Sequence, residues 1–334
     1  MLQNWRDMST LKPIEPQSKQ LEPYLEELRK KYKSEVYAAD RYVEVFKIRQ
    51  NLYAMYAPCT HAVGDNWLYL IDGPDRALYI DNGYGIGDLK GLGELLTGKE
   101  VICAVTHCHG DHAGGSPQWE EILCHAYCAE MLERQMENYD DWWRRFNKVG
   151  EAQHRRYYRD EDVIPFRPYI PVGLPDHSVI NLGGDYEIEL IHMGGHSPGL
   201  SCFLDKKSRI LFSGDALFES RFKGLGVGLH NAKPGVLHPE CMGISYYSVQ
   251  LEGLVKRIDE FDDVMAGHGF FDSPSCVSTD TLKAVKQILE DPFCYDLVME
   301  RQSGKTYIKE GGTADVLYVP EEVIENRKLY GKER

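Results

Sequence analysis

The segment with the clearest capacity for chemistry is the run Thr106–Gly115, which reads THCHGDHAGG and directly follows an apolar stretch. His107 and His109 alternate with Cys108, so both imidazoles can point to one side while the thiol points away. Three imidazoles and one carboxylate within six residues suit a borderline cation such as Zn²⁺. The candidate ligands in this run are His107, His109, Asp111 and His112.

Three later residues extend this candidate metal site. His196 lies in the glycine-rich turn GGHSPG, Asp215 ends the run ILFSGD, and His268 lies between two glycines. Each follows a short apolar run of the kind expected for a buried strand. Because loops at strand ends collect functional side chains, we expect these three to join the first group.

The elements that position these residues are predicted from apolar runs separated by turn signals such as DGPD at 72–75. Early strands followed by mixed strands and helices favour helices packed outside a pair of sheets. The expected strands lie within 43–57 and at 67–71, 77–80, 100–106, 187–192, 200–204, 209–212 and 263–266, and the expected helices at 17–33, 88–97, 246–261 and 278–290.

The organisation along the chain predicts one main domain. We expect residues 1–39 to form an N-terminal helical extension and residues 40–310 to form the domain itself. Residues 311–334 are expected to be a C-terminal tail. Within the domain, residues 133–170 are rich in aromatic and charged side chains and read as a helical insertion.

The insertion has two interpretations. Between residues 144 and 159 it carries six basic side chains against one glutamate, so it could be a lid that attracts an anionic substrate, with Arg155 and Arg156 in contact. Alternatively, its charges are solvated and its aromatics pack on the body or on a second subunit, which leaves a homo-oligomer open. His230 and Tyr246 are further candidates for substrate contact. The alternative for His230 is a position in a plain flexible loop, and the alternative for Tyr246 is packing in the core. His192 is expected to be structural or exposed.

Composition excludes several classes of protein. The 334 residues carry 38 Lys and Arg against 52 Asp and Glu, a net charge of −14, which argues against binding to nucleic acid or to anionic lipid. No apolar run approaches the roughly 20 residues of a membrane span, and residues 1–13 lack a signal-type apolar run. The nine cysteines show no paired framework, which favours reduced thiols and a cytoplasmic location.

The order His-x-His-x-Asp-His from His107, followed by His196, Asp215 and His268, resembles the metallo-β-lactamase superfamily over roughly residues 40 to 290. The resemblance implies an α+β fold, a four-layer αββα sandwich with the site at one edge of the sheets. It also implies two metal positions. One takes His107, His109 and His196, the other takes Asp111, His112 and His268, and Asp215 bridges them.

The run ILFSGDALF at 210–218, with GHSPG, is similar to the glyoxalase II-like thioester hydrolases. We therefore expect a binuclear metal-dependent hydrolase of a small molecule. A metal-activated hydroxide would attack a thioester, lactone or other acyl ester, and Asp111 would accept or relay a proton. The cofactors are expected to be two divalent ions, zinc by default, with iron or manganese compatible with the same ligands. The alternatives are a phosphodiesterase with the same metal site and a di-iron redox enzyme.

Overall fold

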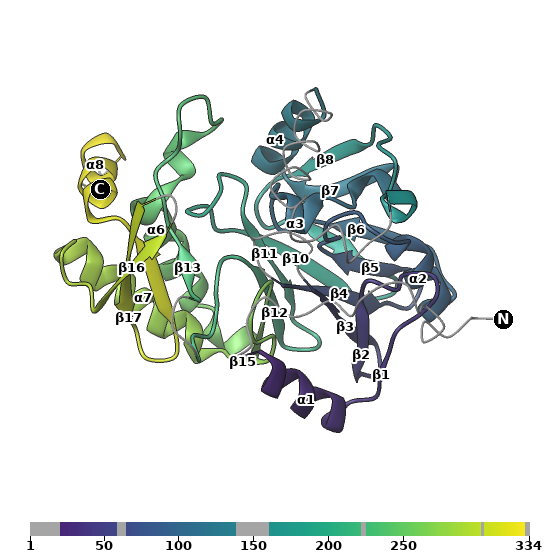
Figure 1. Ribbon diagram of the computed structural model, residues 1–334. Coiled ribbons are helices and arrows are strands. Elements are labelled where there is room, and N and C mark those ends of the chain that lie inside the picture. Colours follow the sequence, from purple (N-terminus) through teal and green to yellow (C-terminus); the bar gives the residue numbers. More distant parts are fainter. Residues whose placement is uncertain (1–20, 59–64, 138–159, 222–224, 302–303, 331–334) are drawn as a thin grey trace. The chain divides into compact units, whose positions relative to one another are not determined.

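The computed structural model describes residues 21–58, 65–137, 160–221, 225–301 and 304–330 (Figure 1). The chain divides into two compact units. The first comprises residues 1–124, 129–173 and 181–187, and the second comprises residues 125–128, 174–180 and 188–334. Within the described ranges, no helix is both long enough and apolar enough to cross a membrane.

The first unit is built on one sheet whose strands follow the order β1 to β8. Strands β1 to β5 pair antiparallel, and β6 lies parallel to both β5 and β7. Trp67, Tyr69 and Tyr79 are among its fully buried side chains. The strands are β1 (Ser34–Glu35), β2 (Glu44–Arg49), β3 (Leu52–Ala57), β4 (Asn66–Asp72), β5 (Ala77–Ile80), β6 (Val101–Ala104), β7 (Glu121–His125) and β8 (Ile170–Leu174).

Helices of the first unit are fixed by local signals in the sequence. In α2 (Leu89–Thr97), the Asp88 side chain caps the N-terminus by accepting a hydrogen bond from Gly91, and Gly98 ends the helix in the left-handed conformation. In α1 (Glu22–Lys31), the buried face includes Leu25 and Leu28. The remaining helical segments are α3 (Gly110–Ala113), η2 (Ser116–Gln118), α4 (Ala126–Glu137) and η3 (Asp160–Asp162).

The second unit contains two sheets that share one core with the helices. One sheet has the order β15-β14-β12-β11-β10-β9 and the other the order β13-β18-β17-β16. Leu251 of α6, Val285 of α7 and Tyr318 of β18 are fully buried in this core. The strands are β9 (Val179–Asn181), β10 (Glu187–His192), β11 (Ser201–Asp205), β12 (Ile210–Gly214), β13 (Val227–Gly228), β14 (Asp263–Ala266), β15 (Ser273–Pro274), β16 (Leu297–Arg301), β17 (Gly304–Glu310) and β18 (Asp315–Tyr318). The helices are η4 (Pro239–Cys241), α6 (Gly243–Val255), η5 (Ile258–Glu260), α7 (Cys276–Glu290) and α8 (Pro320–Tyr330).

Most elements expected from the sequence are present. Strands β10 and β14 have the expected bounds, and the run 43–57 is the hairpin of β2 and β3. Residues 311–334, expected as a tail, include β18 and α8. Of the expected insertion at 133–170, α4 covers the beginning, whereas residues 138–159 lie outside the described part of the chain.

Glu189 of β10 is the centre of an ionic network in the second unit. Arg257 donates two hydrogen bonds to its carboxylate, at 2.9 and 2.7 Å, and Lys206 and His177 approach to 3.0 and 2.8 Å. Burial alone would raise the pKa of Glu189, but the bonds from Arg257, His177 and Lys206 outweigh it and hold the pKa at about 2. The folded state therefore favours the charged carboxylate.

We expect Glu189→Gln to lower the free energy of unfolding by about 1 kcal/mol at pH 7, since solvent screens part of this network. Because the pKa of Glu189 is lower in the folded state, its carboxylate stabilises the fold at pH values above the ordinary pKa of 4.5. This stabilisation is lost as the pH falls towards 2. Urea unfolding from pH 7 to pH 2.5 should therefore show the difference between wild type and Glu189→Gln closing below about pH 4.5.

Glu300→Gln is the matched control, because the exposed Glu300 lies 3.6 Å from Lys305 in an isolated pair. It should leave stability unchanged at every pH. A difference between wild type and Glu189→Gln that stays constant down to pH 2.5 would contradict the assigned role.

Candidate metal centre

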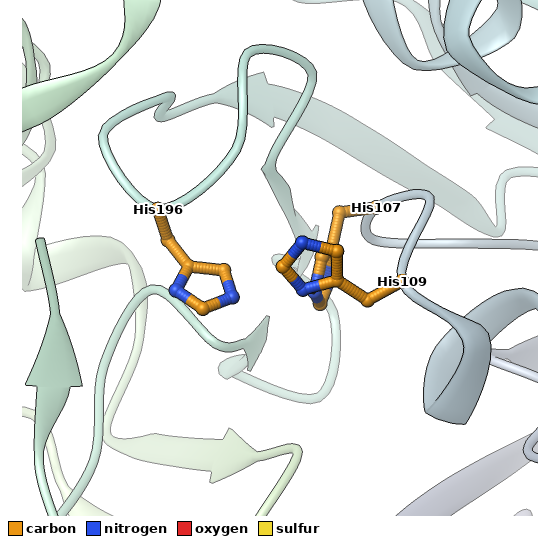
Figure 2. A group of neighbouring side chains, drawn as sticks. All are labelled: His107, His109 and His196. Atoms are coloured by element: carbon orange, nitrogen blue, oxygen red, sulfur yellow. The ribbon is translucent and has the colours of Figure 1, made fainter. Parts of the chain in front are cut away.

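The loop after β6 brings the first group of candidate ligands together within the first unit. His107 Nε2 lies 3.0 Å from His109 Nδ1, and both rings are drawn in Figure 2. The rings of His107 and His112 lie 4.2 Å apart between centroids. At the start of α3, Asp111 places Oδ2 3.6 Å from His112 Nε2. All of these except His109 are buried, so the donors gather in a largely dehydrated environment.

Asp81 anchors this loop and lies outside the residues predicted from the sequence. It follows β5, which is the parallel neighbour of β6, so its carboxylate reaches the start of the histidine loop. Its Oδ1 accepts the Thr106 backbone N–H at 2.7 Å, and its Oδ2 accepts the Thr106 hydroxyl at 2.9 Å and His112 Nδ1 at 2.8 Å. The available signal was a carboxylate at the end of an expected strand, the feature that identified Asp215.

These bonds fix the tautomers of two histidines. A carboxylate only accepts hydrogen bonds, so His112 carries its proton on Nδ1. The Thr106 hydroxyl donates to Asp81 and therefore accepts from His107 Nδ1, at 3.1 Å. Each ring is left with its Nε2 lone pair on the opposite side. Such oriented imidazoles, held by oxygen partners behind the ring, are typical of metal ligands.

The second group lies within the second unit, where β12 and β14 run parallel and end at the same edge of the sheet. Asp215 follows β12 and His268 follows β14, and Asp215 Oδ1 lies 3.4 Å from His268 Nε2. The other oxygen, Oδ2, lies 3.3 Å from His196 Nε2. One carboxylate therefore presents a separate oxygen to each of two imidazoles.

The environment of His196 implies a cation at this carboxylate. Its Nδ1 lies 3.0 Å from the Gly228 carbonyl oxygen, which only accepts, so Nδ1 carries the proton. On the other side of the ring, Nε2 faces Asp215 Oδ2, an oxygen that only accepts. Either a proton or a metal ion must lie between them, and imidazole with carboxylate is a donor set that divalent metals take.

The turn that carries His196 requires glycine at two positions. Gly194 and Gly195 have φ values of +61° and +78°, a region that side chains rarely adopt. A Cβ at Gly194 would also lie 2.6 Å from the Cys241 carbonyl oxygen, and one at Gly195 would lie 2.7 Å from Cβ of Tyr247. His196, drawn in Figure 2, is therefore held on a tight loop against the start of α6.

The remaining sequence candidates are placed as follows. The Tyr246 hydroxyl lies 3.2 Å from His192 Nδ1, and His230 is half-exposed with Nδ1 3.7 Å from Glu322. Arg155 and Arg156 lie outside the described residues. Burial raises the pKa of the Cys108 thiol to about 12, in agreement with a side chain directed away from the ligands.

Three of the curated proteins similar to this chain are named acyl-coenzyme A thioesterase MBLAC2. The human protein is 32% identical over 169 residues, covering 46% of this chain and 58% of the relative. The chicken protein is 33% identical over 163 residues, covering 46% and 57% respectively. The chain thus matches little more than half the length of these relatives.

Solved structures with the same fold have much lower sequence identity. A metallo-beta-lactamase from Pontibacter korlensis is 17% identical with a TM-score of 0.53, covering 73% of this chain and 99% of that one. A metallo-beta-lactamase family protein from Thermus thermophilus is 19% identical with a TM-score of 0.51, covering 75% and 85%. At these identities the likeness shows the fold alone, and it confirms the expected α+β sandwich class.

The family model described as metallo-beta-lactamase superfamily matches residues 62–292, a stretch that holds all seven candidate ligands. The resemblance seen in the sequence is thereby confirmed: this chain belongs to the metallo-beta-lactamase superfamily.

Proposed function

We propose that this protein is a metal-dependent hydrolase of small-molecule thioesters. The observation that carries the proposal is Asp215, whose two oxygens face the Nε2 atoms of His196 and His268 at 3.3 and 3.4 Å. A carboxylate in this position can be shared by two cations and offsets part of their mutual repulsion. The thioester substrate is supported by the acyl-coenzyme A thioesterases among the relatives.

We further propose that the two ligand groups serve one centre with two divalent ions, zinc by default. The support is membership of the superfamily together with the donor chemistry of each group. His107, His109 and His196 would hold one ion, Asp111, His112 and His268 the other, and Asp215 both. When bound, the metal would polarise the thioester carbonyl and lower the pKa of a water molecule.

The protein's own residues would contribute orientation and proton transfer. Asp81 holds His112 directly and His107 through Thr106, so their Nε2 lone pairs stay aligned. Asp111 is the proposed proton acceptor. Its carbonyl oxygen accepts Asn66 Nδ2 at 2.8 Å, which fixes the backbone that presents the carboxylate. The glyoxalase II-like assignment, the anionic substrate and the cytoplasmic location stay predictions.

The substrate class is tested on metal-quantified enzyme with an acyl-coenzyme A, a simple lactone and an activated phosphodiester. We expect thioester hydrolysis to dominate, to disappear with a chelator and to return with zinc. Asp215→Asn should lower both zinc content and thioesterase activity, the latter by at least about 100-fold, because an amide has a single neutral oxygen and cannot be shared by two cations as a carboxylate can.

Asp259→Asn is the matched control, since Asp259 is an exposed aspartate of η5 in the same unit. Its zinc content and activity should equal those of the wild type. A wild-type protein that retains no divalent metal, or an Asp215→Asn protein that hydrolyses thioesters normally, would refute the proposal.

The role of Asp81 gives a separate prediction. Asparagine has one acceptor oxygen and so cannot take all three hydrogen bonds that Asp81 accepts. We expect Asp81→Asn to weaken zinc binding about 10- to 100-fold, as measured by competition with a chromophoric chelator. Normal zinc affinity in a folded Asp81→Asn protein would show that this carboxylate does not orient the ligands.

A further inference from the structure

His192 forms a side-chain bridge across the base of the turn that carries His196. It is the last residue of β10, and its Nε2 lies 2.7 Å from the Pro198 carbonyl oxygen on the far side of the turn. His192 is only 4% exposed, so this hydrogen bond is shielded from water. The bridge therefore ties the residue before the turn to a residue just after His196.

The hydrogen bonds of His192 require one neutral tautomer. The Pro198 carbonyl only accepts, so Nε2 carries the proton, and Nδ1 accepts from the Tyr246 hydroxyl at 3.2 Å. The ring of His125 stacks on that of His192 at 3.9 Å with an interplanar angle of 3°. Burial lowers the pKa of His192, and it lowers the pKa of His125 to about 4, so both rings are neutral at pH 7.

The turn itself has a backbone that needs such support. Met193 N and Gly194 N both donate to the Leu200 carbonyl oxygen, which closes the turn at its base. Between these points Gly194 and Gly195 adopt conformations with positive φ, where the backbone is intrinsically adaptable. Because His192 binds the Pro198 carbonyl oxygen, it restrains the segment from which the His196 side chain projects.

We infer that His192 is a positioning residue, which sets the direction of the His196 lone pair through its hydrogen bond to Pro198. The inference rests on the proposed function, in which His196 is a metal ligand. His192 would bind neither metal nor substrate. Its effect would be transmitted entirely through the geometry of the turn, as expected for a group behind the ligands that holds them in place.

Two neutral amide variants separate positioning from packing. Glutamine keeps an N–H near the place of Nε2 and can still donate to Pro198, whereas asparagine is one methylene too short. Both variants lose the ring that stacks on His125. His192→Gln should therefore keep zinc affinity within about threefold of wild type, and His192→Asn should lose about 10- to 100-fold.

The measurements are zinc affinity by chelator competition, the visible spectrum of the cobalt-loaded protein, and urea unfolding of the metal-free protein. We expect the two variants to unfold alike, while only His192→Asn changes the cobalt spectrum. His177→Gln, at an exposed histidine of the same unit, should match the wild type in zinc affinity and in cobalt spectrum.

Equal zinc affinity in His192→Gln and His192→Asn, whether normal or reduced, would overturn the positioning role while leaving the proposed function intact. A wild type that binds no divalent metal would overturn the proposed function, and this inference with it. If His192→Asn does not fold, His192→Met replaces it, since methionine has the length of glutamine but no hydrogen-bond donor for the Pro198 carbonyl oxygen. Unchanged zinc affinity in that variant would overturn the inference.

Discussion

The candidate centre depends on one constraint, the protonation of three of its five imidazoles on the nitrogen that faces the protein. His112 and His107 are held on Nδ1 by Asp81 and Thr106, and His196 by the Gly228 carbonyl. With one nitrogen committed to a protein oxygen, the other presents a lone pair in a fixed direction. The protein thus holds one side of each of these candidate ligands, and the direction of the remaining lone pair follows from that contact.

Buried parallel strands bring residues of each ligand group together. Asp81 and the histidine loop follow the parallel neighbours β5 and β6, whereas Asp215 and His268 follow the parallel neighbours β12 and β14. Parallel strands end at the same edge of a sheet, so residues far apart in sequence meet there, and the intervening chain forms the crossover between the strands. Each unit uses the same device once, and each group of ligands is assembled within its own sheet.

The sequence predicted the elements that carry the ligands because their signals are local. Strands such as β10 and β14 are short apolar runs, and the ligands are marked by an unusual density of histidine beside glycine. Asp81 was missed because a single aspartate after a strand is common and its role appears only when β5 lies beside β6. The bridge from His192 to Pro198 was hidden for the same reason: nothing in the spacing of the two residues indicates which nitrogen is protonated.

The same arrangement links the candidate site to the stability of the second unit. His196 Nε2 and Asp215 Oδ2 face each other at 3.3 Å, with the two side chains 19% and 11% exposed. A proton or a metal ion between them supplies the positive charge that draws these two acceptors together. A metal ion that binds these donors only in the folded state would stabilise that state, so its binding and the folding of this unit would be thermodynamically linked. The core around α6 and α7 also contains Met193, Ala216 and Ala266, which lie close in the chain to the three candidate ligands of this unit, so the same packing fixes the backbone that carries them.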